Sequence, residues 1–225
     1  MRRTKEEAEQ TRRRIMQAAL RTFHRRGIAR TTLEQVARAA RVTRGAIYWH
    51  FSGKQALLRA IRDDVSLPLV DRGDFTLLDQ AAAEPLERID RFLRDLLSAV
   101  VEDEHTRLVF AVMSFRCEYV GELASELEEY VRKNRRLCNA LTRVYRQAQR
   151  QGAGLNGLSP RLAALDTLVF LAGLLRLWLL DEHGQLGMRR AARLLIAAHV
   201  KGRRAAARPG KRAASALRKT ARQAA

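Results

Sequence analysis

A segment of 31 residues near the N-terminus, Thr31 to Ile61, constrains the fold more than any other part of this chain. Its apolar and small residues predict two short helices joined by a tight turn, followed by a longer helix. Two helices joined in this way form a helix-turn-helix, in which the first helix braces the second. The second short helix, TRGAIYWHF, carries small, basic and aromatic residues in place of an ordinary amphipathic pattern. We therefore predict that this helix presents its side chains to a partner outside the protein.

The charge of the chain is distributed in three parts, which indicates the nature of that partner. Residues 1–62 have a net charge of +12, residues 63–200 of −2 and residues 201–225 of +9, within a formal total of +19. Basic N- and C-terminal segments on either side of a near-neutral body indicate a module that binds a polyanion, attached to a domain with a different function. The neutral body argues against a general excess of arginine. Double-stranded DNA is the polyanion that fits a helix-turn-helix.

The rest of the chain is predicted to be helical, which makes the fold class all-α. Proline occurs only four times and alternating runs of β-branched residues are absent, so strands are not expected. Thr31 precedes Glu34 by three residues, which predicts a capping box for the second helix. A fourth helix should begin near Lys54 and end before Pro68. The other expected helices are 6–26, 85–103, 105–119, 121–151, 159–182 and 187–200, with a loop or broken helix over 71–84.

The chain is expected to divide into a DNA-binding domain (1–53), a body (54–200) and a disordered basic tail (201–225). The N-terminus lacks the apolar segment of a secretory signal, which favours a cytoplasmic protein with reduced cysteines. The most apolar run of the whole chain, residues 168–180, spans 13 residues and is interrupted by Arg176. A membrane-spanning helix needs about 20 such residues. We therefore expect this run to be a core or interface helix.

The side chains around the second short helix suit contacts with DNA. Arg44 can donate two hydrogen bonds to guanine O6 and N7. Its small neighbours Gly45 and Ala46 let the backbone approach the base edges. Tyr48 and Lys54 suit phosphate oxygens. The predicted DNA-binding residues are Thr31, Thr32, Thr43, Arg44, Gly45, Ala46, Tyr48, Trp49, His50 and Lys54.

The segment VTRGAIYWHFSGK resembles the recognition-helix signature of the TetR family of bacterial repressors, closest to its AcrR/TtgR-like branch of multidrug-efflux repressors. RCEYVGEL (116–123) and GLLRLWLL (173–180) resemble motifs in the body of that branch. The resemblance covers about residues 1–200. It implies an all-helical homodimer of about nine helices per subunit, with three helices for DNA binding and a ligand-binding and dimerisation body. It further implies a ligand-responsive repressor on a palindromic operator, released by a small lipophilic, cationic or aromatic inducer and controlling a drug-efflux pump.

Three features depart from the pattern of that family. Arg41 occupies the turn position that the family usually gives to glycine, and a left-handed arginine costs roughly 1 kcal/mol. Ser52 and Gly53 replace a more polar pair before Lys54. The basic tail after residue 200 has no counterpart in the family.

The resemblance also points to ligand and dimer contacts in the body, where apolar and aromatic residues are abundant. Such residues are typical of a pocket for lipophilic molecules, although most stripes of this kind are simply core. The predicted ligand-binding residues are Ser66, Phe92, Met113, Ser114, Glu118, Phe170 and Leu174. The predicted dimer contacts are Leu168, Leu175, Trp178 and Leu179.

Other motifs in the chain do not predict chemistry. The G-x-G-x-x-G match at 152–157 follows a helix and not the strand that a dinucleotide site requires. The Asp-Glu-His runs at 103–105 and 181–183 place adjacent side chains in different directions, and the two cysteines lack zinc-site spacing. We expect no catalytic group, metal or cofactor. The remaining alternative is an architectural, nucleoid-type DNA-binding protein that uses its basic head and tail.

Overall fold

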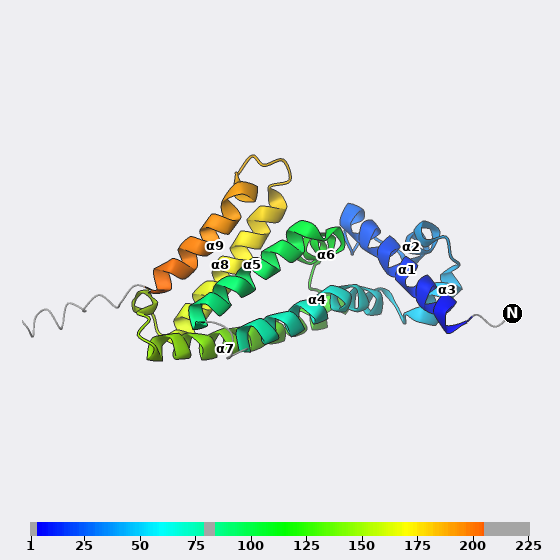
Figure 1. Cartoon of the computed structure of the whole chain (residues 1–225). Helices are drawn as coiled ribbons and strands as arrows, with labels where there is room; N and C mark the ends of the chain where they lie inside the picture. Colours follow the sequence, from blue (N-terminus) through cyan, green and yellow to red (C-terminus); the bar gives the residue numbers. More distant parts are fainter. Residues whose placement is uncertain (1–3, 79–83, 205–225) are drawn as a thin grey trace, which may run out of the picture. The chain divides into compact units, whose positions relative to one another are not determined.

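The computed structural model describes residues 4–78 and 84–204, excluding the side chains of residues 66–76, 78 and 122. Within these ranges the chain forms nine α-helices and two short 3-10 helices, and no strand (Figure 1). The predicted all-α class is confirmed. The elements are α1 (Lys5–Arg26), α2 (Leu33–Ala40), α3 (Arg44–His50), α4 (Lys54–Leu78), α5 (Pro85–Glu102), α6 (Glu104–Phe115), η1 (Gly121–Leu123), α7 (Ala124–Arg150), η2 (Leu155–Gly157), α8 (Pro160–Leu180) and α9 (Met188–Arg204).

Three predicted helix ends were wrong, and so was part of the loop or broken helix predicted over 71–84. The helix predicted over 105–119 ends at Phe115, and residues 71–78 belong to α4. The fourth helix does not stop before Pro68 but continues to Leu78, because an internal proline removes one backbone hydrogen bond without ending a long helix. The last helix runs to Arg204, so residues 201–204 belong to α9 and not to the basic tail. The remaining tail, 205–225, lies outside the described residues.

The cap of α2 is shifted by one residue from the prediction. Thr32, and not Thr31, is the N-cap: its hydroxyl accepts from Gln35 N at 3.2 Å, and Gln35 Oε1 accepts from Thr32 N at 3.1 Å. Thr31 is instead buried, and its hydroxyl donates to the Gly27 carbonyl at 2.7 Å. Both threonines have a suitable partner three residues later, so spacing alone did not distinguish them.

The turn between α2 and α3 has the left-handed residue anticipated from the sequence. Arg41 ends α2 with φ 53° and ψ 47°, and the next amide, Val42 N, donates to the Ala37 carbonyl at 3.0 Å. Thr43 then caps α3, its hydroxyl accepting from Ala46 N at 3.1 Å. These local bonds fix where the recognition helix begins.

The chain forms two compact units. The first contains residues up to Gly73 together with Asp95–Lys133, and the second contains Asp74–Arg94 together with residues from Asn134 onward. In the first unit, one apolar core joins the helix-turn-helix to α4, α6 and η1; its fully buried members include Phe23, Ile28, Ile47, Leu57 and Ile61. The unit that holds the recognition helix therefore also includes most of α4 and the start of α7.

In the second unit, hydrogen bonds between buried polar groups connect three helices. The hydroxyls of Tyr145 on α7 and Thr167 on α8 are 2.6 Å apart, and Thr167 Oγ1 lies 2.9 Å from His199 Nε2 on α9. Within the described residues, α8 alone is long and apolar enough to span a membrane by length and composition. A core or interface helix meets the same criterion, and these contacts place α8 within a helical unit.

Candidate DNA-binding site

The third helix exposes four of its seven residues, and Ala46 and His50 are half-buried. Of its residues only Ile47 is buried, and it anchors α3 in the core of the first unit. Arg44 and Gly45 are exposed, Tyr48 is 48% exposed and Trp49 is 73% exposed. A short, capped helix that presents a cation and two large aromatic groups to solvent has the form of a recognition surface.

Arg44 and Tyr48 form a pair on the exposed face of α3. They are one turn apart; Arg44 Nη2 donates to the Tyr48 hydroxyl at 3.3 Å, and the guanidinium lies 5.5 Å from the Tyr48 ring centroid. The hydrogen bond to Tyr48 raises the pKa of Arg44 above its ordinary value. The contact with Tyr48 holds the guanidinium at the surface, where it is available to a base edge or a phosphate.

The small residues of α3 leave open space. A Cβ built on Gly45 would meet only the Thr43 hydroxyl, at 3.9 Å, so packing within the protein does not demand glycine here. Ala46 is half-buried. At the other end of the helix, the rings of Trp49 and His50 meet edge to face with centroids 4.5 Å apart.

The predicted threonine contacts divide into two groups. Thr32 and Thr43 are exposed, although both hydroxyls already accept hydrogen bonds from cap amides. Thr31 is only 2% exposed, and this burial argues against the DNA contact predicted for it. Its hydroxyl stabilises the turn that follows α1.

Lys54 has internal partners that the sequence did not suggest. Its ammonium donates to the carbonyls of Ile28, Ala29 and Thr31 at 3.0, 3.4 and 3.3 Å. These bonds tie the start of α4 to the turn between α1 and α2. Lys54 thus positions the helix-turn-helix, and the phosphate contact predicted for it stays a prediction.

The predicted ligand residues occupy different surroundings. Phe92 and Leu174 are buried in the second unit, where Phe170 stacks on His199 with ring centroids 4.1 Å apart. In the first unit, Met113 packs against the core, and Ser114 and Glu118 are exposed. The side chain of Ser66 lies outside the described residues.

A cavity of about 220 Å³ in the first unit is lined by Arg26 to Arg30 and by Phe115 to Glu118. Among the predicted ligand residues whose side chains the structure describes, Glu118 alone lies in its lining. The ligand set as a whole stays a prediction.

Three of the four predicted dimer contacts lie on the side of α8 that the chain itself covers. Leu175, Trp178 and Leu179 are 4–7% exposed, and Leu168 is half-buried. The guanidinium of Arg189 also covers the Trp178 ring, at 4.6 Å from its centroid. The apolar residues that α8 exposes are others: Leu162, Leu165, Val169, Leu177 and Leu180.

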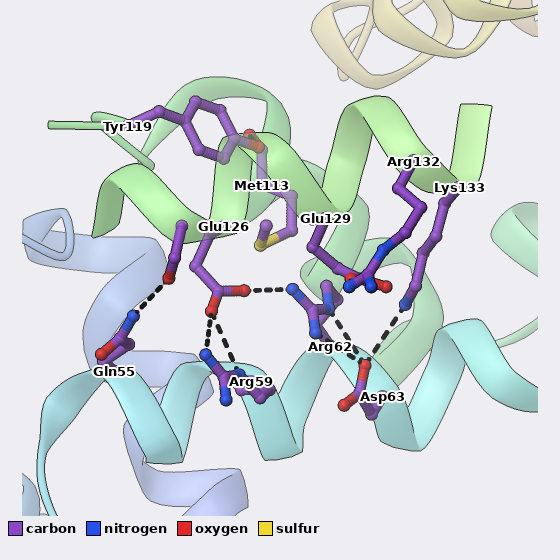
Figure 2. A network of polar contacts seen from close by, with 11 residues as sticks. Gln55, Arg59, Arg62, Asp63, Met113, Tyr119, Glu126, Glu129, Arg132 and Lys133 are labelled. Carbon is purple, nitrogen blue, oxygen red and sulfur yellow. Dashed lines mark hydrogen bonds and ion pairs between the residues drawn. The ribbon is translucent and has the colours of Figure 1, made fainter. Parts of the chain in front are cut away.

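Sequence reasoning missed a polar cluster between α4 and α7 (Figure 2). We call it the α4–α7 charge cluster and define it as Arg59, Arg62, Asp63, Glu126 and Lys133, which are joined by ion pairs. The carboxylate of Glu126 is 1% exposed. The only signal in the sequence was opposite charge on two helices, which cannot indicate that residues more than 60 positions apart meet.

Cys117 does not have the features of a reactive or metal-binding thiol. Burial raises the pKa of the Cys117 thiol to about 11, with Glu126 acting in the same direction. The thiol is therefore protonated at neutral pH and is a poor nucleophile and metal ligand. Both Cys117 and Cys138 are free, and within the described ranges no three His, Cys, Asp or Glu residues are grouped to hold a metal ion.

A capped helix-turn-helix with an exposed, basic and aromatic second helix, followed by a helical body, defines a helix-turn-helix DNA-binding regulator. Comparison with protein families refines this class. Residues 15–61 match the family described as bacterial regulatory proteins, tetR family, and residues 84–202 match the C-terminal region of MAATS-type transcriptional repressors. The chain belongs to the TetR family.

Individual relatives support the same assignment along most of the chain. It is 33% identical over 180 residues to the HTH-type transcriptional regulator TtgR of Pseudomonas putida, covering 80% of this chain and 85% of TtgR. The crystal structure of NalD, the secondary repressor of the MexAB-OprM multidrug efflux pump in Pseudomonas aeruginosa, matches with a TM-score of 0.76 and 27% identity, covering 87% of this chain and 97% of NalD. The complex of SmeT with triclosan matches with a TM-score of 0.71 and 28% identity, and the match covers 89% of this chain and 93% of SmeT. SmeT is described as the repressor of the Stenotrophomonas maltophilia pump SmeDEF.

Proposed function

We propose that this protein is a ligand-responsive transcriptional repressor that binds a palindromic operator as a homodimer and acts in the cytoplasm. The observation that carries the proposal is the exposed face of α3, where Arg44 and Tyr48 are paired and Trp49 is open, on a chain of the TetR family. A dimer would place two such helices in successive major grooves, about 34–36 Å apart. Arg44 would read a base edge. The sugar-phosphate backbone of the DNA would be contacted by Thr32, Thr43 and Tyr48.

The regulated gene is proposed to encode a drug-efflux pump, and the inducer to be a small lipophilic molecule, cationic or aromatic. NalD and SmeT are repressors of such pumps, and SmeT has been crystallised with triclosan. An inducer can release the operator only if it binds the DNA-incompetent conformation more tightly than the competent one. The body from α5 to α9 matches a repressor C-terminal region and is the proposed site of that binding.

Dimerisation is proposed to use the apolar side of α8 that the chain leaves exposed, together with α9. Val169 on α8 and Leu194 on α9 are 72% and 73% exposed. Two helices from each subunit would form an isologous four-helix interface and bury these side chains. The proposed contacts replace Leu175, Trp178 and Leu179, which the chain already buries.

The test is a selection of DNA from a random library by the full-length protein at moderate salt. A single enriched palindrome is expected. Arg44→Ala should then lose discrimination at the base pair that Arg44 reads, by about 10- to 100-fold. Arg38→Ala is the matched control, because it removes an exposed arginine from α2 and leaves α3 unchanged.

The same selection separates the proposal from the architectural alternative, which the family assignment does not favour. Binding through phosphates alone would enrich no sequence and would weaken steeply with salt. If Arg44→Ala kept full discrimination, the base-reading role would be wrong. Once an operator is known, triclosan is the first compound to test for release of the protein from it.

The basic tail is proposed to raise affinity for DNA in general while the helix-turn-helix supplies specificity. Residues 205–225 contain six lysines and arginines. The chain should be shortened after Arg204 and not at residue 201, because Arg203 belongs to α9 and pairs with Asp166. The truncation should lower non-specific affinity more than operator discrimination, and an equal loss of both would contradict this division.

A further inference from the structure

The α4–α7 charge cluster is built around one buried carboxylate. Glu126 is the third residue of α7, and two arginines of α4 occupy both of its oxygens (Figure 2). Oε1 accepts from Arg59 Nε at 3.2 Å and from Arg59 Nη2 at 3.1 Å, and Oε2 accepts from Arg62 Nη1. Because a buried charge is costly without its partners, this arrangement strongly favours one position of α4 against the start of α7.

A second, reversed ion pair lies further along the same two helices. Here α4 supplies the anion and α7 the cation: Lys133 Nζ donates to Asp63 Oδ1 at 3.3 Å, and Arg62 donates to the same oxygen at 2.9 Å. A neutral contact precedes both pairs, where Gln55 Nε2 donates to Ser125 Oγ at 2.7 Å. The two helices are thus joined at three levels in the same order along each.

The alternation of charge selects one register of the two helices. Arg62 donates to both Glu126 and Asp63, and Lys133 shares the Asp63 oxygen with Arg62, so each like-charged pair already has an opposite charge between its members. A shift of α4 along α7 in either direction would break these attractive pairs and leave the like charges without the opposite charge between them. Charge patterns that penalise the alternatives in this way are a common source of specificity between packed helices.

The opposite side of α4 is part of the core that carries the recognition helix. Leu57, Leu58 and Ile61 of α4 share that core with Ile47, the single buried residue of α3. Lys54 adds its bonds to the turn between α1 and α2. A displacement of α4 along α7 therefore displaces α3 as well, since close-packed cores move as units.

We propose that Glu126 is a positioning residue for operator recognition: through Arg59 and Arg62 it fixes the register of α4 on α7, and so the position of the recognition helix, without touching DNA. The inference rests on the proposed function. A dimer must hold its two recognition helices at the spacing of the two half-sites. If α4 can adopt several registers, only a fraction of molecules matches that spacing, and the apparent affinity falls in proportion.

The experiment compares Glu126→Gln with Glu128→Gln in the full-length protein. Glu128 is exposed on the same turn of α7, so the control removes the same charge outside the cluster. Three kinds of DNA are used: the selected palindrome, palindromes with half-sites one base pair closer or farther apart, and a duplex with one half-site. Thermal unfolding of each variant is measured alongside.

Glu126→Gln is expected to lose at least about 10-fold in affinity for the palindrome, which is about 1.4 kcal/mol. It should lose less than about threefold on the single half-site and should discriminate less between spacings, whereas Glu128→Gln should match the native protein. Equal loss on the palindrome and the half-site would show that α3 itself is damaged and would overturn the proposal. Unchanged or tighter binding to the palindrome would overturn it too.

A second set of variants keeps the proposal testable if Glu126→Gln does not fold. The Arg59 side chain is 52% exposed, so Arg59→Met should fold and show the same pattern at smaller amplitude, with Arg38→Met as its control.

If the native protein enriches no palindrome, the proposed function fails. If it binds the palindrome and discriminates spacing, but Glu126→Gln behaves as Glu128→Gln does, only the positioning role fails.

Discussion

At the scale of single residues, Arg41 shows how this protein tolerates strain in its DNA-binding motif. A non-glycine residue in the left-handed region costs free energy because its Cβ approaches the backbone. Arg41 adopts φ 53° and ψ 47° to end α2, and the hydrogen bonds of the turn and the buried Val36, Ala37 and Ala40 maintain that conformation. The turn that orients the recognition helix is therefore maintained by its surroundings and not by the preference of the residue within it.

Arg41→Gly is expected to stabilise the protein by up to about 1 kcal/mol, because glycine adopts this conformation without a Cβ clash. The larger unfolded-state entropy of glycine reduces the gain by a few tenths of a kcal/mol. Urea denaturation at neutral pH measures the change. Arg38→Gly, inside α2, is the control and should destabilise by about 1 kcal/mol. If Arg41→Gly destabilised the protein, the arginine side chain would have to make a stabilising contact that outweighs the strain.

The same residues show what the sequence could predict. The left-handed turn was suggested only by the resemblance to the TetR family, which usually has glycine at the position of Arg41, because an arginine by itself does not favour that conformation. The cap of α2 was misplaced by one residue because Thr31 and Thr32 both satisfy the spacing rule. Their difference is tertiary, since Thr31 is buried against the turn after α1 and Thr32 is exposed. Local rules therefore placed the helix correctly and its cap only approximately.

At the scale of elements, α3 was predictable and the α4–α7 charge cluster was not. The recognition helix exposes its Arg44, Tyr48 and Trp49 side chains, so their role could be predicted from the local sequence without knowledge of distant contacts. Glu126 lies in the acidic run SELEEY, which reads as an ordinary solvated helix start. Its burial arises from Arg59 and Arg62, more than 60 residues earlier, and no periodicity indicates that contact. The same limit applies to Lys54, whose internal partners are backbone carbonyls.

The contact between α8 and α9 predicts a dependence of stability on pH. His199 stacks on Phe170 and bonds to Thr167, with Asp166 and Arg203 as its charged neighbours. Burial lowers the pKa of His199; Arg203 acts in the same direction and Asp166 opposes it. The unfolded chain then binds a proton at His199 more readily than the folded chain. The contribution of His199 to the free energy of unfolding should therefore be greatest above about pH 6.5, and it should decrease as the pH falls below that value.

The measurement is urea denaturation of the native protein and of His199→Gln between pH 7.5 and pH 5. The variant should be less stable at pH 7.5 and should lose less stability on acidification, because its amide does not titrate. His183→Gln, in the exposed loop between α8 and α9, is the control and should follow the native curve. A variant curve parallel to the native one would show that other groups cause the acid sensitivity.

At the scale of the whole molecule, the sequence indicated an interface helix but not the side of it that faces a partner. Helix α8 is apolar almost all round, so its periodicity did not distinguish the side covered by its own chain. The structure makes that distinction: Leu175, Trp178 and Leu179 are buried, whereas Val169 and other apolar residues are exposed. The packing of the chain around α8, and not the sequence pattern of α8, determines which apolar residues remain for a second subunit.

Val169→Glu is therefore expected to weaken the homodimer. The isologous interface would contain the new carboxylate twice, and burying an unpaired charge costs several kcal/mol. We expect the dimer dissociation constant to rise at least about 100-fold, which is about 2.7 kcal/mol, in analytical ultracentrifugation. Affinity for the palindromic operator should fall with it, whereas binding to a single half-site should persist because α3 is unchanged.

Two controls test whether the exposed side of α8 is responsible. Val120→Glu places the same charge at a residue that is 68% exposed before η1, and it should leave the dimer intact. Leu175→Ala removes a buried side chain of α8, so it should lower the stability of each subunit by about 2–5 kcal/mol. A folded Val169→Glu that stays dimeric at nanomolar concentration would place the interface elsewhere. Dissociation of Val120→Glu would show instead that the surface before η1 takes part in it.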